Sequence, residues 1–202
     1  MGTSYLYSIG HGQKPFEVFV NELLSFDIGF LIDVRSNPFS KWAPHFNKGV
    51  LDNFLRGLPI RYIYMGDVIG GRPIDDNCYD EDGYFDYHKM ALEPTFINGI
   101  QRLISANSQH LKVAVMCSET NPADCHRSKL IGRELYFGSE ISMSHIIAPG
   151  IVRSQAEIMT ELDRGKGNWP EGDLFEAPHP PYFKSRKSYK DVELLDEFNP
   201  YD

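Results

Sequence analysis

The segment IGFLIDVRS, at residues 28–36, constrains the fold more than any other part of the chain. It is apolar almost without interruption until it ends in Asp33, Arg35 and Ser36. A strand with one face in water alternates apolar and polar residues, whereas a nearly continuous apolar strand is buried on both faces. Such strands occur in parallel sheets that carry helices on both sides. The segment therefore predicts an α/β fold with polar groups at the carboxyl end of a strand.

The rest of the chain follows a rhythm of strands and helices that supports this fold. Further strand-like runs occupy residues 5–11, 60–66, 111–117 and 142–150. Apolar residues recur at helical spacing in residues 15–26, 47–58 and 93–106, and again in the segment that follows residue 117. Strands that alternate with helices of this length predict a three-layer α/β domain with a parallel sheet, Rossmann-like or flavodoxin-like.

Two segments depart from the rhythm. Residues 68–90 form a long, acidic, aromatic and glycine-rich connection, and connections of this length are usually functional or mobile. From residue 165 the chain is rich in proline, aromatic and charged residues, with a basic run KSRKSYK before an acidic run DVELLDEF. We expect a single α/β domain at 1–164 with an insertion at 68–90. Residues 165–202 should form an extended C-terminal arm that packs on the domain or on a partner, or is partly disordered.

Composition limits the compartment and the partners. No apolar run approaches the ~20 residues that a membrane span needs, and the first residues lack the basic start and apolar core of a secretory signal. Three irregularly spaced cysteines do not form a disulfide framework, so we expect a cytoplasmic protein without a structural disulfide. The formal net charge of −8 excludes a uniformly basic protein that coats nucleic acid, although a local basic cleft is compatible with it.

Reactive side chains are concentrated in MCSETNPADCHRSK, residues 116–129, where a predicted strand ends. Ligands of open α/β sheets bind outside the carboxyl ends of the strands. Glu119 is a candidate acid/base group or nucleophile, with His126 in proton transfer and Cys117 and Cys125 as further catalytic candidates. Each also has a structural interpretation: Cys117 or Cys125 as a small core residue, and Glu119 as a surface residue.

The same segment carries the signs of a helix start. Asn121 suits the N-cap, Pro122 the first helical position and Asp124 the capping-box position, so a helix is expected to begin before Cys125. Its positive end and the guanidinium of Arg127 would together attract an anion. The structural alternative is that Arg127 pairs with a nearby acid in a salt-bridge cluster.

Polar groups also follow the other predicted strands. His11 ends the first strand, and Arg35, Ser36 and Ser40 follow the second. Because parallel strands end at one edge of a sheet, we expect these side chains to converge on the same cleft as the residues that follow Cys117. His11 would take part in proton transfer, and Arg35 would hold an anion together with Arg127.

Four blocks in this chain resemble, in order and rough spacing, the signature blocks of the family called "domain of unknown function 488". They are SIGHG, DVRSNPFS, IRYIYMGDVIGGRP and MCSETNPADCHR, and the resemblance covers about residues 4–150. The chain departs from the family pattern at Gly12, where serine is usual, and at Ile69, where leucine is usual. The resemblance implies a fold and an active site that includes Gly70 and Gly71, but no settled reaction. Cysteine-phosphatase chemistry is rejected because a Cys-x5-Arg loop is absent.

Three functions remain open at this stage. In the first, the protein is an enzyme that hydrolyses or transfers a group at a glycosidic or phosphate bond of a nucleotide or nucleic acid, with Tyr87 and other insertion aromatics stacking on a ring. In the second, the same cleft binds a phosphate-bearing ligand or nucleic acid without catalysis. In the third, Cys117 and Cys125 form a redox or metal site, with His126 and His11 as further metal ligands. The cysteine spacing matches no usual zinc pattern, so we assign no metal and no cofactor.

Overall fold

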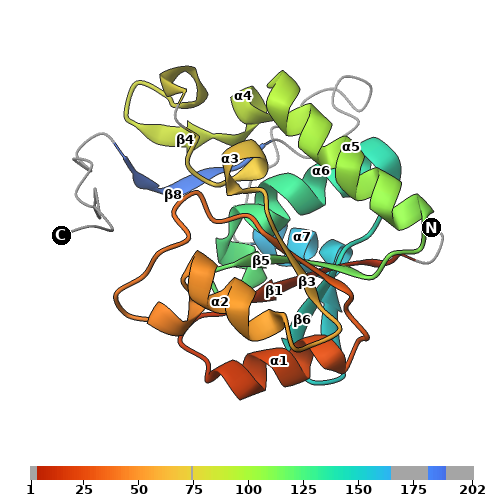
Figure 1. The fold of residues 1–202 in the computed structure, drawn as a ribbon. Coiled ribbons are helices and arrows are strands. Elements are labelled where there is room, and N and C mark those ends of the chain that lie inside the picture. Colours follow the sequence, from red (N-terminus) through yellow and green to blue (C-terminus); the bar gives the residue numbers. More distant parts are fainter. Residues whose placement is uncertain (1–3, 74, 165–181, 190–202) are drawn as a thin grey trace.

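The computed structural model describes residues 4–73, 75–164 and 182–189 (Figure 1). The strands are β1 Leu6–Gly10, β2 Phe30–Asp33, β3 Arg61–Tyr64, β4 Tyr84–Asp86, β5 Val113–Cys117, β6 Ser144–Ala148, β7 Ile151–Ser154 and β8 Lys184–Ser188. The α-helices are α1 Phe16–Leu24, α2 Lys48–Leu55, α3 Gly66–Ile69, α4 Tyr87–Ala91, α5 Pro94–Ser108, α6 Arg133–Ser139 and α7 Gln155–Arg164. The tighter or wider helical turns are η1 Pro44–Phe46, η2 Asp76–Cys78, η3 Pro122–Asp124 and η4 Arg127–Gly132. No helix within these ranges has both the length and the apolar character needed to cross a membrane.

The central sheet has six strands in the order β3-β2-β5-β1-β6-β7. The first five pair in parallel, and β7 joins the edge antiparallel to β6. In the middle of the sheet, β5 is buried along its whole length. The α/β fold with a parallel sheet is therefore confirmed. Each of the five predicted strands is present, whereas β7 and α7 were not predicted.

The helices form a layer on each face of the sheet. Helices α1 and α2 lie on one face. There Phe19, Leu23, Leu51 and Leu55 pack against the strand side chains that point to this face. Helices α3 to α6 contribute to the second core cluster, with Phe96, Leu103 and Leu135 among its members, and Figure 1 shows the two layers. Since each face of the sheet is covered, the strands need no polar alternation.

The chain leaves two neighbouring strands in opposite directions. From β2 it runs through α2 to β3 at the sheet's edge, while from the adjacent β5 it runs through η4 and α6 to β6 beyond β1. The carboxyl ends of β2 and β5 thus flank a topological switch point. In open α/β sheets the crevice at such a point is where ligands bind.

The insertion and the arm meet in a second, two-stranded sheet. β4, from the predicted insertion, pairs antiparallel with β8, from the predicted C-terminal arm, and Lys184 contacts Asp80 at 2.7 Å. β8, which carries most of the arm's basic run, therefore lies against the acidic insertion (Figure 1). Residues 165–181 and 190–202 of the arm lie outside the described residues.

The helix predicted after Cys117 begins later than expected, and not as an α-helix. Asn121 does accept a hydrogen bond from the Ala123 N–H, but it caps only the single 3-10 turn η3. A π-helix, η4, follows at Arg127, and regular α-helix begins at Arg133. The α-helical start expected before Cys125 is therefore not found in this segment.

A chain of buried polar groups ties α7 to the sheet. The Ser8 hydroxyl lies 2.6 Å from His145 Nδ1, His145 Nε2 lies 2.8 Å from Gln155 Oε1, and the Gln155 amide donates to the Ser128 carbonyl. Burial, with help from the charge of Arg127, lowers the pKa of His145 to about 3. The imidazole is therefore held neutral in the folded protein.

This network predicts a pH dependence of stability. Unfolded His145 takes up a proton below about pH 6.5, whereas the folded side chain does so only near its lowered pKa, so stability present above pH 6.5 is lost towards pH 3. Between pH 7 and pH 4.5, the wild type should lose about 2–3 kcal/mol more free energy of unfolding than His145→Gln. Urea denaturation of both proteins at each pH measures the difference. Parallel pH curves for the two proteins would show that His145 titrates normally.

Candidate functional site

A pocket with a volume of about 500 Å³ lies at the switch point between β2 and β5. Its walls come from the loops after both strands, from the insertion and from β8. The lining residues are Arg35, Ser36, Asn37, Phe39, Gly71, Arg72, Tyr87, Cys117, Ser118, Glu119, Asp124, Cys125, His126, Ser185 and Tyr189. Eight of the residues predicted for the site are among them: Arg35, Ser36, Gly71, Tyr87, Cys117, Glu119, Cys125 and His126.

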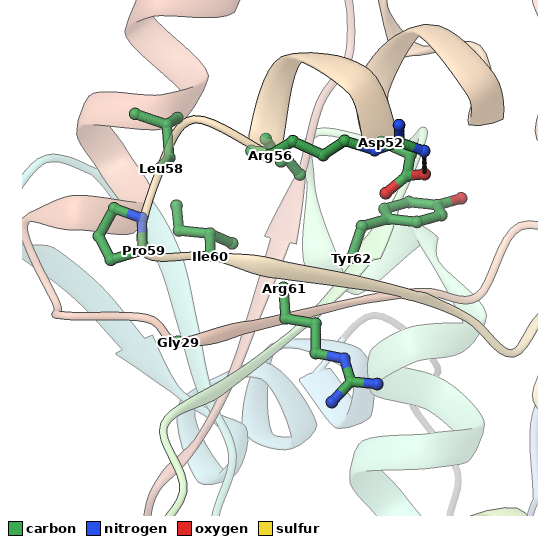
Figure 2. A pocket seen from close by; sticks show the side chains of 9 residues that line it. Gly29, Asp52, Arg56, Leu58, Pro59, Ile60, Arg61 and Tyr62 are labelled. Carbon is green, nitrogen blue, oxygen red and sulfur yellow. Dashed lines mark hydrogen bonds and ion pairs between the residues drawn. The ribbon is translucent and has the colours of Figure 1, made fainter.

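A second hollow of about 520 Å³ lies at the opposite, amino end of β2 and β3. Figure 2 shows its lining, with the exposed Asp52–Arg56 ion pair beside the ring of Tyr62 and Arg61 on the other side of the strand. Its ionisable groups are a surface ion pair and single side chains, and it is remote from the carboxyl edge of the sheet. We therefore place the candidate functional site in the switch-point pocket.

Two cysteines and a histidine form a compact cluster in that pocket. The Sγ atoms of Cys117 and Cys125 lie 3.9 and 3.7 Å from His126 Nδ1, and all three donor atoms lie within 4.8 Å of one another. A hydrogen bond from Cys125, aided by His126 and the charge of Arg127, lowers the pKa of Cys117 well below its ordinary value. Burial and the neighbouring Cys117 sulfur raise the pKa of Cys125. Of the two thiols, Cys117 is therefore the one whose pKa is lowered.

Glycine positions shape the wall around His126. A Cβ at Gly71 would lie 2.7 Å from His126 Nδ1, so only glycine lets the backbone pass this close to the ring. A Cβ at Gly70 would strike the Gly66 carbonyl and the Ser36 hydroxyl. Ser36 accepts a 2.7 Å hydrogen bond from the Arg72 N–H. Gly70, Gly71 and Ser36 therefore position the turn that carries Arg72 into the pocket wall.

Arg35 is largely committed to the protein itself. Its guanidinium makes a bidentate pair with Asp33, at 2.9 and 2.6 Å, and donates to the Phe46 carbonyl and to His11 Nε2. These four bonds use four of the five N–H donors of an arginine, which leaves at most one for a ligand. Tyr62 extends the cluster by donating to Asp33. Arg35 thus lies in a structural salt-bridge cluster with Asp33 and not in an open anion clamp.

His11 belongs to this cluster and does not line the pocket. Its Nδ1 lies 2.8 Å from the Gly12 carbonyl, so Nδ1 carries the proton and Nε2 accepts from Arg35. Burial, followed by the charge of Arg35, lowers the pKa of His11 to about 4. Ser40 also lies outside the lining, where its hydroxyl accepts from the N–H groups of Trp42 and Ala43.

Arg127 points into the protein and not into the pocket. It is 1% exposed, and its guanidinium donates to the backbone carbonyls of Glu119 and Thr120. Within the described ranges it pairs with no carboxylate, and it does not line the switch-point pocket. Arg127 instead fixes the loop between Cys117 and Asn121.

Replacing Arg127 therefore tests a loop-fixing role. Arg127→Met keeps the apolar length and removes the donors, so the carbonyls of Glu119 and Thr120 lose a charged partner and the free energy of unfolding should fall by about 1–3 kcal/mol. Phosphate affinity, measured by isothermal titration, should stay unchanged as long as the variant remains folded. A loss of phosphate binding without a loss of stability would restore the anion-clamp interpretation.

Arg72 is the arginine that the pocket leaves available. Its side chain is exposed, and its guanidinium carbon lies 4.6 Å from the ring centroid of Tyr189. In the described ranges it has no carboxylate partner. Tyr189 was not predicted as a site residue, and Arg72 only as part of a wider basic footprint, because their meeting depends on β8 folding back onto the insertion.

Two further predicted residues keep a place in the pocket. The Glu119 carboxylate is exposed and, within the part of the chain that the structure describes, has no hydrogen-bond partner or ion pair. Tyr87 is buried against Phe85, with ring centroids 4.9 Å apart, and burial raises the pKa of its hydroxyl. The pocket therefore combines one uncommitted carboxylate, one uncommitted guanidinium and aromatic walls.

Comparison with known proteins identifies the family. No curated protein and no solved structure matches the chain. One family matches residues 15–133, under the description "Domain of unknown function DUF488". The matched part contains three of the four signature blocks, and the fourth, SIGHG, lies before it. Because this match spans more than half of the 202 residues, the chain belongs to the DUF488 family.

Proposed function

We propose that this protein is an enzyme that hydrolyses or transfers a group at a glycosidic or phosphate bond of a nucleotide or nucleic-acid substrate. One observation carries the proposal. The pocket at the switch point brings the uncommitted Glu119 carboxylate together with the Arg72–Tyr189 stack. A carboxylate supplies acid/base or nucleophilic chemistry, while an arginine on an aromatic ring suits a charged ring compound.

The binding part of the proposal rests on Arg72 and the aromatic side chains. Arg72 can donate in a fork to a phosphate, the role that Arg35 and Arg127 were expected to play. Tyr189 and Phe39 line the same pocket, and Phe39 is 47% exposed. Bases and sugars of nucleotides stack on such rings, so a phosphate-bearing ring compound fits this wall better than an aliphatic anion does.

The catalytic part rests on Glu119 and its neighbours. A carboxylate at the carboxyl end of a central strand can activate a water molecule or attack an anomeric carbon or a phosphorus atom directly. The buried charge of Arg127 holds the Glu119 carbonyl, so the backbone beneath this carboxylate is fixed. Cys117 and His126 line the pocket beside it.

The proposal predicts binding that depends on Arg72 and turnover in the same pocket. Wild-type protein is incubated with mononucleotides, nucleosides and short single-stranded DNA and RNA, and released base, phosphate or shortened strands are measured by chromatography and mass spectrometry. For the substrate found, Arg72→Ala should weaken binding about 10- to 100-fold, since a charge-assisted hydrogen bond is lost.

A matched arginine provides the control. Arg61 is exposed at the opposite end of the sheet and lines the other hollow (Figure 2), so Arg61→Ala should leave binding unchanged. Equal losses in the two variants would indicate a non-specific charge effect. Binding without any product would favour the non-catalytic binding module, and absence of both binding and product would reject the proposed function.

A further inference from the structure

The geometry points to a metal site in the pocket: we propose that Cys117, Cys125 and His126 bind one divalent transition-metal ion, with Zn²⁺ the ion that fits best. This metal site and the proposed function share the same pocket, but the metal site does not depend on the proposed reaction. It differs from our expectation from sequence, which assigned no metal.

The spacing of the donor atoms matches the coordination shell of zinc. Bonds of about 2.3 Å to sulfur and about 2.0–2.1 Å to nitrogen at tetrahedral angles place sulfur and nitrogen ligands about 3.6 Å apart, and two sulfurs about 3.8 Å apart. The two sulfur-to-Nδ1 separations are 3.9 and 3.7 Å, and the whole triangle fits within 4.8 Å. The two sulfur-to-nitrogen separations lie within a few tenths of an ångström of the zinc values, and the sulfur-to-sulfur separation, at most 4.8 Å, would have to close by no more than about 1 Å.

The surroundings hold the three side chains in place. Cys117 ends the central strand β5, and Gly71 packs against the His126 ring beside Nδ1. The Arg127 N–H lies 3.5 Å from Cys125 Sγ and donates to it, as backbone amides do around metal-bound sulfur. His126 Nε2 has no hydrogen-bond partner among the described residues, so the polar contacts of the ring are the two sulfurs.

Charge and ligand type select the class of ion. The three side chains are 6%, 2% and 7% exposed, and a buried group of charges is stable only when it is balanced. Two thiolates and a divalent cation sum to zero. Two sulfur ligands and one imidazole favour zinc or a related transition metal over magnesium or calcium, which prefer oxygen.

The site is open on one side. Three protein ligands with a free fourth position are the pattern of catalytic zinc, whereas structural zinc has four protein ligands. Cys117, Cys125 and His126 all line the pocket, so the fourth position faces the space where Glu119 and Arg72 also lie. A substrate oxygen or a water molecule can reach the ion there. From sequence this set was only an alternative, since the spacing of Cys117 and Cys125 matches no usual zinc pattern; the loop that Arg127 fixes is what brings the two sulfurs together.

Metal uptake by the reduced full-length protein tests the proposal. The protein is freed of metal with a chelator, reduced, and titrated with Co²⁺ and then Zn²⁺, and bound metal is measured by mass spectrometry. We expect about one ion per chain, a thiolate-to-cobalt charge-transfer band, and displacement of Co²⁺ by Zn²⁺. Cys117→Ala and Cys125→Ala should each bind at least about 100-fold more weakly and lose the band.

The third cysteine gives a matched control. Cys78 is also buried, and its sulfur contacts Met90 Sδ at 4.0 Å instead of the cluster. Cys78→Ala should therefore retain both stoichiometry and spectrum. Circular dichroism of each variant shows whether it is folded. If the Cys117 and Cys125 variants do not fold, the metal titration of the wild type alone decides whether the site exists.

The outcomes separate this proposal from its alternatives and from the proposed function. Folded, reduced wild type that takes up no stoichiometric metal overturns it, as does uptake that Cys117→Ala leaves intact. A Cys117–Cys125 disulfide that, once reduced, yields a protein without metal affinity also overturns it and favours a redox pair. Since uptake is measured without substrate, a protein that binds the ion but turns nothing over would reject the proposed function alone.

Discussion

Asp33→Ala should lower the free energy of unfolding by about 3–5 kcal/mol, the cost of leaving a buried charge without its partner. Asp33 is completely buried, and both its oxygens are used: it accepts from Arg35 Nε and Nη2, from the Arg35 N–H and from the Tyr62 hydroxyl. Of the partners that the described part of the chain provides, the substitution leaves the 5%-exposed guanidinium of Arg35 with His11 and the Phe46 carbonyl. Urea denaturation measures the change.

An exposed ion pair supplies the control for this prediction. Asp52 pairs with Arg56 at 3.0 Å on the surface of α2, with 40% and 71% of the two side chains exposed. Exposed pairs of this kind contribute about 0–1 kcal/mol, so Asp52→Ala should change stability by no more than that. If Asp33→Ala costs as little as Asp52→Ala, Arg35 is not anchored by Asp33 and regains its predicted role as an anion clamp.

Arg35 illustrates how far the sequence could predict the site. The apolar run of residues 28–36 correctly placed this side chain at the carboxyl edge of a buried parallel strand. The direction of the guanidinium was missed, although a signal was present. Asp33 and Arg35 are two residues apart, and in an extended chain such residues point to the same face. An acid and an arginine so placed can pair with each other before either meets a ligand.

The helix after Cys117 shows where local patterns fail. The NPAD segment does cap a turn, as its residue types indicate. The chain then widens into the π-helix, where the Gln155 amide donates a hydrogen bond to the Ser128 carbonyl. A Cβ at Gly132 would lie 2.2 Å from Gln155 Oε1, so Gln155 also packs closely against the backbone there. Gln155 opens α7, which comes later in the chain. Cap chemistry acts within a few residues, so it carries no information about this contact.

Tyr189 could not be placed in the pocket from sequence for the same reason. It follows β8, about 100 residues after the strand with which β8 pairs. The basic and acidic compositions of the two segments were visible, but composition does not fix strand register. Arg72, which stacks on Tyr189, depends on the same long-range pairing for its position.

Glu119→Gln should lower the turnover number about 10²- to 10⁴-fold, the usual contribution of a positioned acid or base, while the binding of substrate changes little. Glutamine keeps the size and one oxygen acceptor but cannot take up a proton or act as an anionic nucleophile. The exposed carboxylate has no partner among the residues that the structure describes, so the substitution should also leave the melting temperature nearly unchanged. Steady-state kinetics on the substrate found for the wild type measure the effect.

Asp124 makes this prediction specific, because it is the other carboxylate that lines the pocket. It accepts a 3.2 Å hydrogen bond from the Asn121 amide and so helps to hold the turn η3. Asp124→Asn should therefore affect stability more than turnover, the reverse of the pattern expected for Glu119→Gln. If turnover instead falls with Asp124→Asn and survives in Glu119→Gln, the catalytic carboxylate is Asp124. If both variants retain full activity, neither carboxylate takes part in the reaction, and the chemistry must come from the Cys117–Cys125–His126 cluster.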